Sequence, residues 1–349
     1  MLARLKFVAL GATEFEVTKV AWIPSIRGAL VVTLTIFWCL YTGNTAHAIP
    51  LAVGALFVGL ADVDQIVSQR WRTLLTATFC ITLCAMLGGL VSNFGLYQVL
   101  LIAVVGSICG YVGVAGSRSA LIGLLSIVTY AIFSGTPENH LTALATGALV
   151  AIGGLLQTAA TVASTALTAP SEFRIPHQNN HNLGRLRQTL HSQNDFFRHG
   201  ARLGLALAIA MAVYLYLGWP HGYWIPMTVP WISLPNQNGT ATRVISRVAG
   251  SMAGVLIAYA VIEGLQLQTY ATAVFIGVGA LLLLAFVRAN YGVAVSGVTI
   301  FAISLTSLIG QPVGEVSVIR LLSTLIAGAI VIGVAFIWPS VRTEETSDL

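Results

Sequence analysis

Long apolar runs recur along the whole chain, and they restrict it to a membrane fold. A transmembrane helix needs about 20 mostly apolar residues to cross roughly 30 Å of hydrocarbon. Only 8% of the 349 residues are charged, against roughly 25% in soluble domains, so the chain could not cover a water-facing surface. Twelve runs approach or reach the required length, at 25–42, 46–62, 72–92, 96–116, 118–135, 141–166, 201–218, 221–235, 244–263, 269–287, 291–309 and 317–338.

The continuity of these runs predicts an all-α, polytopic helical bundle with about 12 transmembrane helices, and it excludes a β-barrel. Glycine is abundant in them, with 34 residues in all. Gly250 and Gly254 form a small-xxx-small step, a pattern that lets helix backbones approach closely in lipid. We therefore expect helices held together by small residues rather than by hydrophobic burial alone.

The basic residues predict the orientation of the bundle. When the twelve runs are threaded through a membrane, every lysine and arginine except Arg320 falls on one side. Because basic loops stay in the cytoplasm, we expect a multi-pass protein of a bacterial-type inner (plasma) membrane with both termini cytoplasmic. The formal charge of +5 is then explained by topology, and no nucleic-acid partner is predicted.

The two halves of the chain resemble each other. The segment that starts at His47 aligns with the one that starts at Tyr223, which places Pro50 on Pro226. An even number of spans in each half predicts a 6+6 parallel repeat about an axis along the membrane normal. The expected domains are a cytoplasmic interfacial segment (1–24), a first six-helix repeat (25–167), a cytoplasmic linker with a short helix (168–200), a second six-helix repeat (201–340) and a cytoplasmic tail (341–349).

The second half resembles the fusaric-acid-resistance and aromatic-acid-exporter family of inner-membrane proteins. The resemblance rests on YWIPMTVPWISLPNQNGTATRVISRVAG from Tyr223, where Arg243 and Arg247 lie four residues apart, and on RLLSTLIAGAIV from Arg320. It implies a proton-driven exporter of aromatic carboxylic acids or related anions, with plant malate channels as distant relatives. The chain departs from the family in its short linker and in Asn236, where an Asp is common.

Arginines at one end of the spans are the candidate anion pathway. Three pairs are related by the repeat, and Arg243 joins them. One interpretation is that each is a topology anchor whose side chain snorkels to the headgroups. The other is a ring that gathers anions, because the planar guanidinium fork suits carboxylates and basic rings line anion pores. The residues are Arg27, Arg72, Arg118, Arg202, Arg243, Arg247 and Arg288.

Two further sets complete the predicted site. Prolines in the run 221–235 break its helix, and discontinuous helices often mark transporter sites, so this segment is the candidate substrate wall: Trp224, Pro226, Pro230, Trp231 and Asn236. A packing helix with a kink is the alternative. Carboxylates near the membrane are the candidate proton-coupling groups, with simple ion pairing as the alternative: Asp62, Asp64, Glu263 and Glu315.

These observations predict a secondary exporter of small organic anions, with aromatic carboxylic acids as candidates and proton coupling as the energy source. A passive anion channel of the same architecture, or a membrane assembly subunit without transport, are the alternatives. No nucleotide-binding, metalloprotease or nucleophile-elbow motif is present in the sequence, so we predict no enzyme activity, no cofactor and no metal site. The expected partners are the substrate and the lipid bilayer, with a periplasmic adaptor protein or a second copy of the chain as further candidates.

Overall fold

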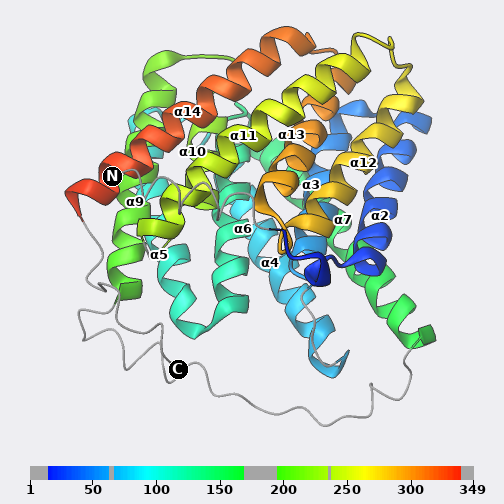
Figure 1. Cartoon of the computed structure of the whole chain (residues 1–349), viewed down its shortest axis with the longest axis horizontal. Helices are drawn as coiled ribbons and strands as arrows, with labels where there is room; N and C mark the ends of the chain where they lie inside the picture. Colours follow the sequence, from blue (N-terminus) through cyan, green and yellow to red (C-terminus); the bar gives the residue numbers. More distant parts are fainter. Residues whose placement is uncertain (1–14, 63–66, 169–194, 235–236, 339–349) are drawn as a thin grey trace.

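The computed structural model describes residues 15–62, 67–168, 195–234 and 237–338, and these parts are helical without any strand. The first half contains α2 (Trp22–Tyr41), α3 (Ala48–Leu60), α4 (Val67–Val91), α5 (Leu96–Tyr111), α6 (Ser117–Ser134) and α7 (His140–Thr168). The second half contains α9 (Asp195–Leu217), α10 (Trp224–Ile232), α11 (Gln237–Ile262), α12 (Thr269–Phe286), α13 (Tyr291–Leu308) and α14 (Val313–Ile337) (Figure 1). Three short 3₁₀ turns accompany them, η1 (Val17–Lys19), η2 (Thr45–His47) and η3 (Val112–Ala115).

The prediction of an all-α polytopic bundle is confirmed, but two of the predicted spans are shorter than expected. Each predicted run holds one helix, and ten of the described helices are long and apolar enough to cross a membrane. The exceptions are α3 and α10, predicted as 46–62 and 221–235. With 13 and 9 residues they are about 20 Å and about 14 Å long. They can lie at membrane depth only because other helices surround them.

Prolines explain where α10 begins and ends. Pro226 stands in the first turn, where a missing N–H costs nothing, whereas Pro230 removes a donor from the helix interior. A further proline follows at position 235, so the Trp231 carbonyl has no N–H four residues ahead of it and the helix ends at Ile232. In α3, Pro50 is likewise the third helical residue, as Pro226 is in α10.

The two short helices form the centre of the bundle. Every residue of α10 is buried, and so is every residue of α3 except Ile49 and Gly59. Helix α3 packs against α2 and α7, while α10 packs against α9 and α14 and also reaches α6 of the first half. The interior therefore lies where the two halves meet, along these two helices.

The order of packing is the same in both halves. The third helix packs against the fifth and the sixth, and the second against the sixth, in each. Between the halves the contacts are reciprocal, since α5 lies beside α9 and α2 beside α12, on opposite sides of the bundle (Figure 1). A twofold repeat would produce this reciprocity. The repeat itself, the domain limits and the orientation of the termini stay predictions. Residues 1–14 of the predicted interfacial segment, most of the predicted linker and the tail lie outside the described residues, whereas η1 and the start of α2 fall within 15–24.

Glycines form the contact between α5 and α9. Gly106 and Gly110 on α5 face Gly200 and Gly204 on α9, each pair being four residues apart. A Cβ atom added at Gly204 would lie 2.6 Å from the carbonyl oxygen of Ala103, so the two backbones touch directly. Close approach at small residues is what holds helices together in lipid, and here it joins the two halves.

We predict that Gly204→Val destabilises the protein by about 1–3 kcal/mol or more, because the new side chain cannot fit against α5 without moving it. The measurement is the midpoint of thermal aggregation in detergent. Gly333→Val is the matched control, since no atom lies within 4 Å of a Cβ at Gly333. Equal midpoints for the two variants would contradict the assignment of this contact.

Candidate functional site

A small cavity lies between the halves, and we call it the central cavity. Its volume is about 60 Å³. The second half contributes both tryptophans of α10 with Arg247 of α11 and Arg320 of α14, and the first half contributes Ile49, Val53 and Phe57 of α3 with Val128 and Ile132 of α6. Of the predicted substrate wall, Trp224 and Trp231 line this cavity, and Pro226 and Pro230 are buried in the same helix. That this wall contacts a substrate stays a prediction.

Arg320 is fully enclosed although it carries a charge. Its exposed fraction is 0%, and it lies about two turns below the start of α14. The guanidinium carbon is 5.0 Å from the centre of the Trp224 ring, a cation–π contact. Within the described residues, none of its three side-chain nitrogens has a hydrogen-bond partner. The indole covers a face of this cation and leaves its donors unused.

Arg247 repeats this arrangement at the other end of α10. Its exposed fraction is 2%, and its guanidinium carbon lies 5.9 Å from the Trp231 ring. Nη1 donates a 3.4 Å hydrogen bond to the Tyr291 hydroxyl, while Nε and Nη2 have no partner among the described residues. Two buried guanidinium groups therefore border the same cavity.

No carboxylate in the described part of the chain forms an ion pair with either group. A buried charge without a partner is costly, because it loses its hydration and gains no compensating interaction. Charged residues inside membrane segments usually mark the route or the binding site of a charged ligand. The cavity is thus suited to a small anion, which would supply the missing counter-charge.

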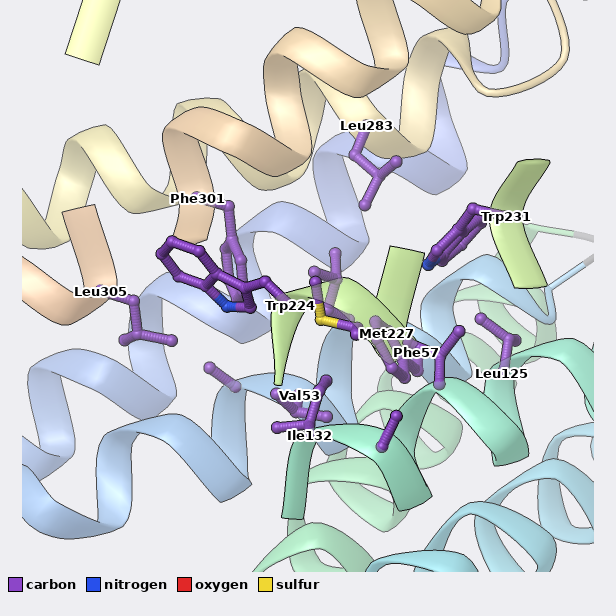
Figure 2. Packing of buried hydrophobic residues seen from close by; sticks show 14 of the residues in the cluster. Val53, Phe57, Leu125, Ile132, Trp224, Met227, Trp231, Leu283, Phe301 and Leu305 are labelled. Atoms are coloured by element: carbon purple, nitrogen blue, oxygen red, sulfur yellow. The ribbon is translucent and has the colours of Figure 1, made fainter. Parts of the chain in front are cut away.

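Most of the remaining lining is apolar, with Thr306 and Tyr223 as the residues that carry a hydroxyl group. Figure 2 shows Met227 between the two tryptophans, with Val53, Phe57 and Ile132 beside it on the side that the first half provides, and Phe301 next to Trp224. One side of the cavity is cationic and aromatic, and the other is apolar without any charge. A ligand with an anionic end and an apolar body would match both sides.

The end of the cavity next to Arg247 is closed by contacts on the Trp231 carbonyl, which α10 leaves unbonded. Arg243 donates to this oxygen at 3.2 Å, and the Tyr291 hydroxyl donates to it at 3.1 Å. The Arg243 guanidinium also lies 4.9 Å above the Tyr291 ring. This cluster connects α10, α11 and α13 and covers the cavity on the arginine-rich side of the bundle.

The opposite end is covered by the segment between α9 and α10. Tyr214 donates a 3.2 Å hydrogen bond to the Gly135 carbonyl, and the Tyr223 ring packs directly on Gly135. His221 stacks on Trp224, with ring centres 5.4 Å apart. These contacts border the central cavity at the end opposite Arg247.

The structure does not gather the other predicted arginines around the cavity. Arg72, Arg118 and Arg288 are exposed. Arg202 is buried beside the end of α14 and donates to the Trp338 carbonyl at 3.4 Å. Arg27 forms an ion pair with Asp62 at 2.6 Å. Of the predicted pathway, only Arg243 and Arg247 lie at the central cavity.

The predicted proton-coupling carboxylates lie away from it as well. Asp62 is held by Arg27 and, at 2.5 Å, by Arg70, and it accepts a 3.4 Å hydrogen bond from Thr161. Glu263 and Glu315 are exposed. Asp64 and the wall residue Asn236 lie outside the described residues. The surroundings of Asp62 fit the ion-pairing interpretation, because its oxygens already have partners.

Arg320 and Tyr291 were absent from the predicted site. Arg320 carried a usable signal, since it is the one basic residue that the threading places on the opposite side of the membrane from all the others. Tyr291 carried none, because its role depends on a carbonyl that only the folded α10 leaves free.

Comparison with known proteins gives sequence matches over part of the chain. Residues 208–334 match the family described as fusaric acid resistance protein-like. The chain is 31% identical over 159 residues to the inner membrane protein YccS of Escherichia coli, a match that covers 44% of this chain and 22% of that protein. It is 29% identical over 156 residues to the uncharacterized protein ORF2 of Neisseria gonorrhoeae, covering 44% of this chain and 37% of the relative.

A third relative, the uncharacterized protein YhfK of Escherichia coli, is 26% identical over 189 residues, which is 54% of this chain and 26% of YhfK. The chain thus spans well under half the length of these relatives. No solved structure matches it.

We predict that Asp62→Asn destabilises the protein by about 3 kcal/mol or more, because it leaves two largely buried arginines without their carboxylate. Thermal unfolding in detergent measures the loss. Adding Arg27→Gln to this variant should restore part of the stability, since one of the unpaired charges is then removed. Glu315→Gln, at an exposed carboxylate, is the control and should unfold like the unaltered protein; a similar loss there would contradict the interpretation.

Proposed function

We propose that this chain is a member of the fusaric acid resistance protein-like family of membrane proteins and that it carries small organic anions across the inner membrane through its central cavity. The family and the inner-membrane relative support a multi-pass protein with a role in transport or efflux. The identity of the transported ion, the direction and the energy source are inferred below from the chemistry of the cavity.

The observation that carries the proposal is the pair of buried, unpaired guanidinium groups, Arg247 and Arg320. A guanidinium presents its N–H groups in a plane and binds a carboxylate through two parallel, charge-assisted hydrogen bonds. Both residues line the cavity. An anion bound there would accept hydrogen bonds from the guanidinium groups and balance their charge. A membrane assembly subunit would have no use for uncompensated charges in its interior.

The apolar part of the lining supports a ligand with an aromatic or aliphatic body. Trp224, Trp231 and Phe57 offer flat apolar surfaces next to the two cations. Aromatic rings pack well in offset or edge-to-face contact with such side chains. Aromatic monocarboxylates combine both features, and they are the substrates that we propose to test first.

The small volume of the cavity supports a carrier over a passive channel. A volume of about 60 Å³ accommodates only a few water molecules, at roughly 10–15 Å³ of such volume each. An aromatic acid would need more space, so α10 and its neighbours must move to admit it. The contacts of Arg243 and Tyr291 on the Trp231 carbonyl would then open on the arginine-rich side.

The membrane potential can drive export without a further ion. An inside-negative potential pushes each monovalent anion outward by about 2.3 kcal/mol per 100 mV. Coupling to protons through Asp62, Asp64, Glu263 or Glu315 stays a prediction. The two exposed glutamates and the ion-paired Asp62 lie apart from the cavity lining, so the potential is the simpler source of energy.

We predict that Arg247→Gln or Arg320→Gln lowers the flux of benzoate by about tenfold or more at low concentration, because each removes charge-assisted hydrogen bonds worth about 1.5–3 kcal/mol. Flux is measured in proteoliposomes with an imposed membrane potential. Arg72→Gln, at an exposed arginine of the same type, is the matched control and should transport normally.

The same variants separate function from folding. Since an unpaired buried charge destabilises a fold, Arg320→Gln should unfold at the same or a higher temperature than the unaltered protein in the absence of anions. Normal flux in both cavity variants, or equal loss in Arg72→Gln, would contradict the proposal.

A further inference from the structure

His221 occupies an unusual place at the end of the central cavity opposite Arg247. It lies in the short segment between α9 and α10, with a φ of 55°, a left-handed conformation that residues other than glycine adopt rarely. Its imidazole is stacked on Trp224 at an interplanar angle of 24° and is hydrogen-bonded to Gln311, from the segment between α13 and α14. Strained backbone that the surroundings hold in place is often found at functional sites.

Trp224 links this imidazole to the cavity. The Trp224 indole stacks on the His221 imidazole and also contacts the Arg320 guanidinium, whose carbon lies 5.0 Å from the ring centre. The two ring distances place the imidazole and the guanidinium within roughly 10 Å of each other, a separation at which charges still interact through a partly buried medium. A titratable group therefore lies one side chain away from the anion site.

We propose that His221 binds a proton from the arginine-poor side of the membrane and thereby raises the affinity of the central cavity for an anion. The inference rests on the proposed function, because it needs an anion between Arg247 and Arg320. Its ligand is the proton, and its effect is regulation of that site by the pH on one side.

The surroundings of His221 determine whether its protonation raises or lowers the affinity of the cavity for an anion. Histidine is the side chain whose charge changes between about pH 5 and pH 8. Burial lowers the pKa of His221, and the hydrogen bond to Gln311 opposes this shift, so the imidazole is neutral at neutral pH and becomes charged as the pH falls. A positive charge there attracts a bound anion and repels the empty, cationic site. Protonation and anion binding therefore favour each other.

The other groups that face His221 do not reverse this sign. Tyr223 lies on the same segment, with ring centres 6.0 Å apart, and Tyr214 of α9 packs on the neighbouring Gly222. Arg320 of α14 lies beyond Trp224. Among the described residues, no carboxylate contributes to the pKa of His221. The group thus responds to the pH and to the charge in the cavity.

The position of His221 suits it to sense the pH on one side of the membrane. It is not placed to carry a proton across the membrane together with the substrate. It lies outside the membrane-spanning helices, so it exchanges protons with the adjacent solution and does not travel with the substrate. Acid on that side would retain the anion in the cavity, and a higher pH would release it. Two unit charges about 10 Å apart change an equilibrium constant roughly two- to sixteenfold at effective dielectric constants between about 80 and about 20.

The test is the affinity of the purified full chain in detergent for benzenesulfonate, measured by calorimetry between about pH 5.5 and about pH 8, where imidazole titrates. This probe stays ionised throughout, so any pH dependence belongs to the protein. We expect the dissociation constant to fall about threefold or more toward acid pH. In His221→Asn it should be independent of pH, because asparagine tolerates the left-handed backbone but does not titrate in this range.

Two further variants sharpen the result. Gln311→Leu removes the hydrogen bond that raises the pKa of His221, so the change in affinity should occur at lower pH. His140→Asn, at an exposed histidine at the start of α7, is the matched control and should behave like the unaltered protein.

A pH-independent affinity in the unaltered protein, or the same pH dependence in His221→Asn, would overturn the role of His221 while leaving the anion site intact. If the unaltered protein binds neither benzenesulfonate nor benzoate at any pH, the anion site itself is wrong, and the proposed function fails together with this inference.

Discussion

The organisation of this bundle depends on two positive charges in an apolar interior. Arg247 and Arg320 are almost completely enclosed, and within the described residues most of their nitrogens have no partner. The two indoles of α10 cover their faces at 5.9 Å and 5.0 Å, which offsets only part of the lost hydration. Such a site is stable when an anion enters it. The binding of an anion and the stability of the closed bundle are thus linked, as for any ligand that binds the folded state alone.

The short helices create the space for these charges. Because α10 ends after nine residues, it cannot fill the interior across the whole membrane, and the side chains of α11 and α14 reach the gap. The freed Trp231 carbonyl then becomes the acceptor for Arg243 and Tyr291. On the side of the first half, α3 supplies an apolar wall instead. The glycine contact of α5 with α9 brings the two halves close enough to enclose the cavity.

Much of the fold could be predicted from the sequence, because backbone N–H and C=O groups in lipid must be bonded within a helix, and each spanning helix needs a long apolar run. Each of the twelve helices lies within or overlaps its predicted run. The lengths of α3 and α10 could not be predicted, because run length measures hydrophobicity, and a buried helix is as apolar as a spanning one. Only the prolines at 226, 230 and 235 indicated that α10 differs from its neighbours.

The site was harder to predict, because the sequence does not distinguish a buried arginine from an exposed one. The predicted repeat pairs Arg72 with Arg247, yet the first is exposed and the second is enclosed. Their surroundings differ because α10 ends beside Arg247 and leaves a cavity there, with Trp231 against its guanidinium. Asp62 is a simpler case. Ion pairing was one of its two interpretations in the sequence, and in the structure it is paired with Arg27 and Arg70.

An experimental structure of the protein with 4-iodobenzoate tests the central claim most directly. Anomalous scattering locates the iodine, and the density shows the position of the carboxylate. The account predicts the carboxylate between Arg247 and Arg320, with the ring against the tryptophans of α10 and Phe57. An empty cavity with the ligand bound elsewhere, or a carboxylate of the chain already bound to both guanidinium groups, would contradict it.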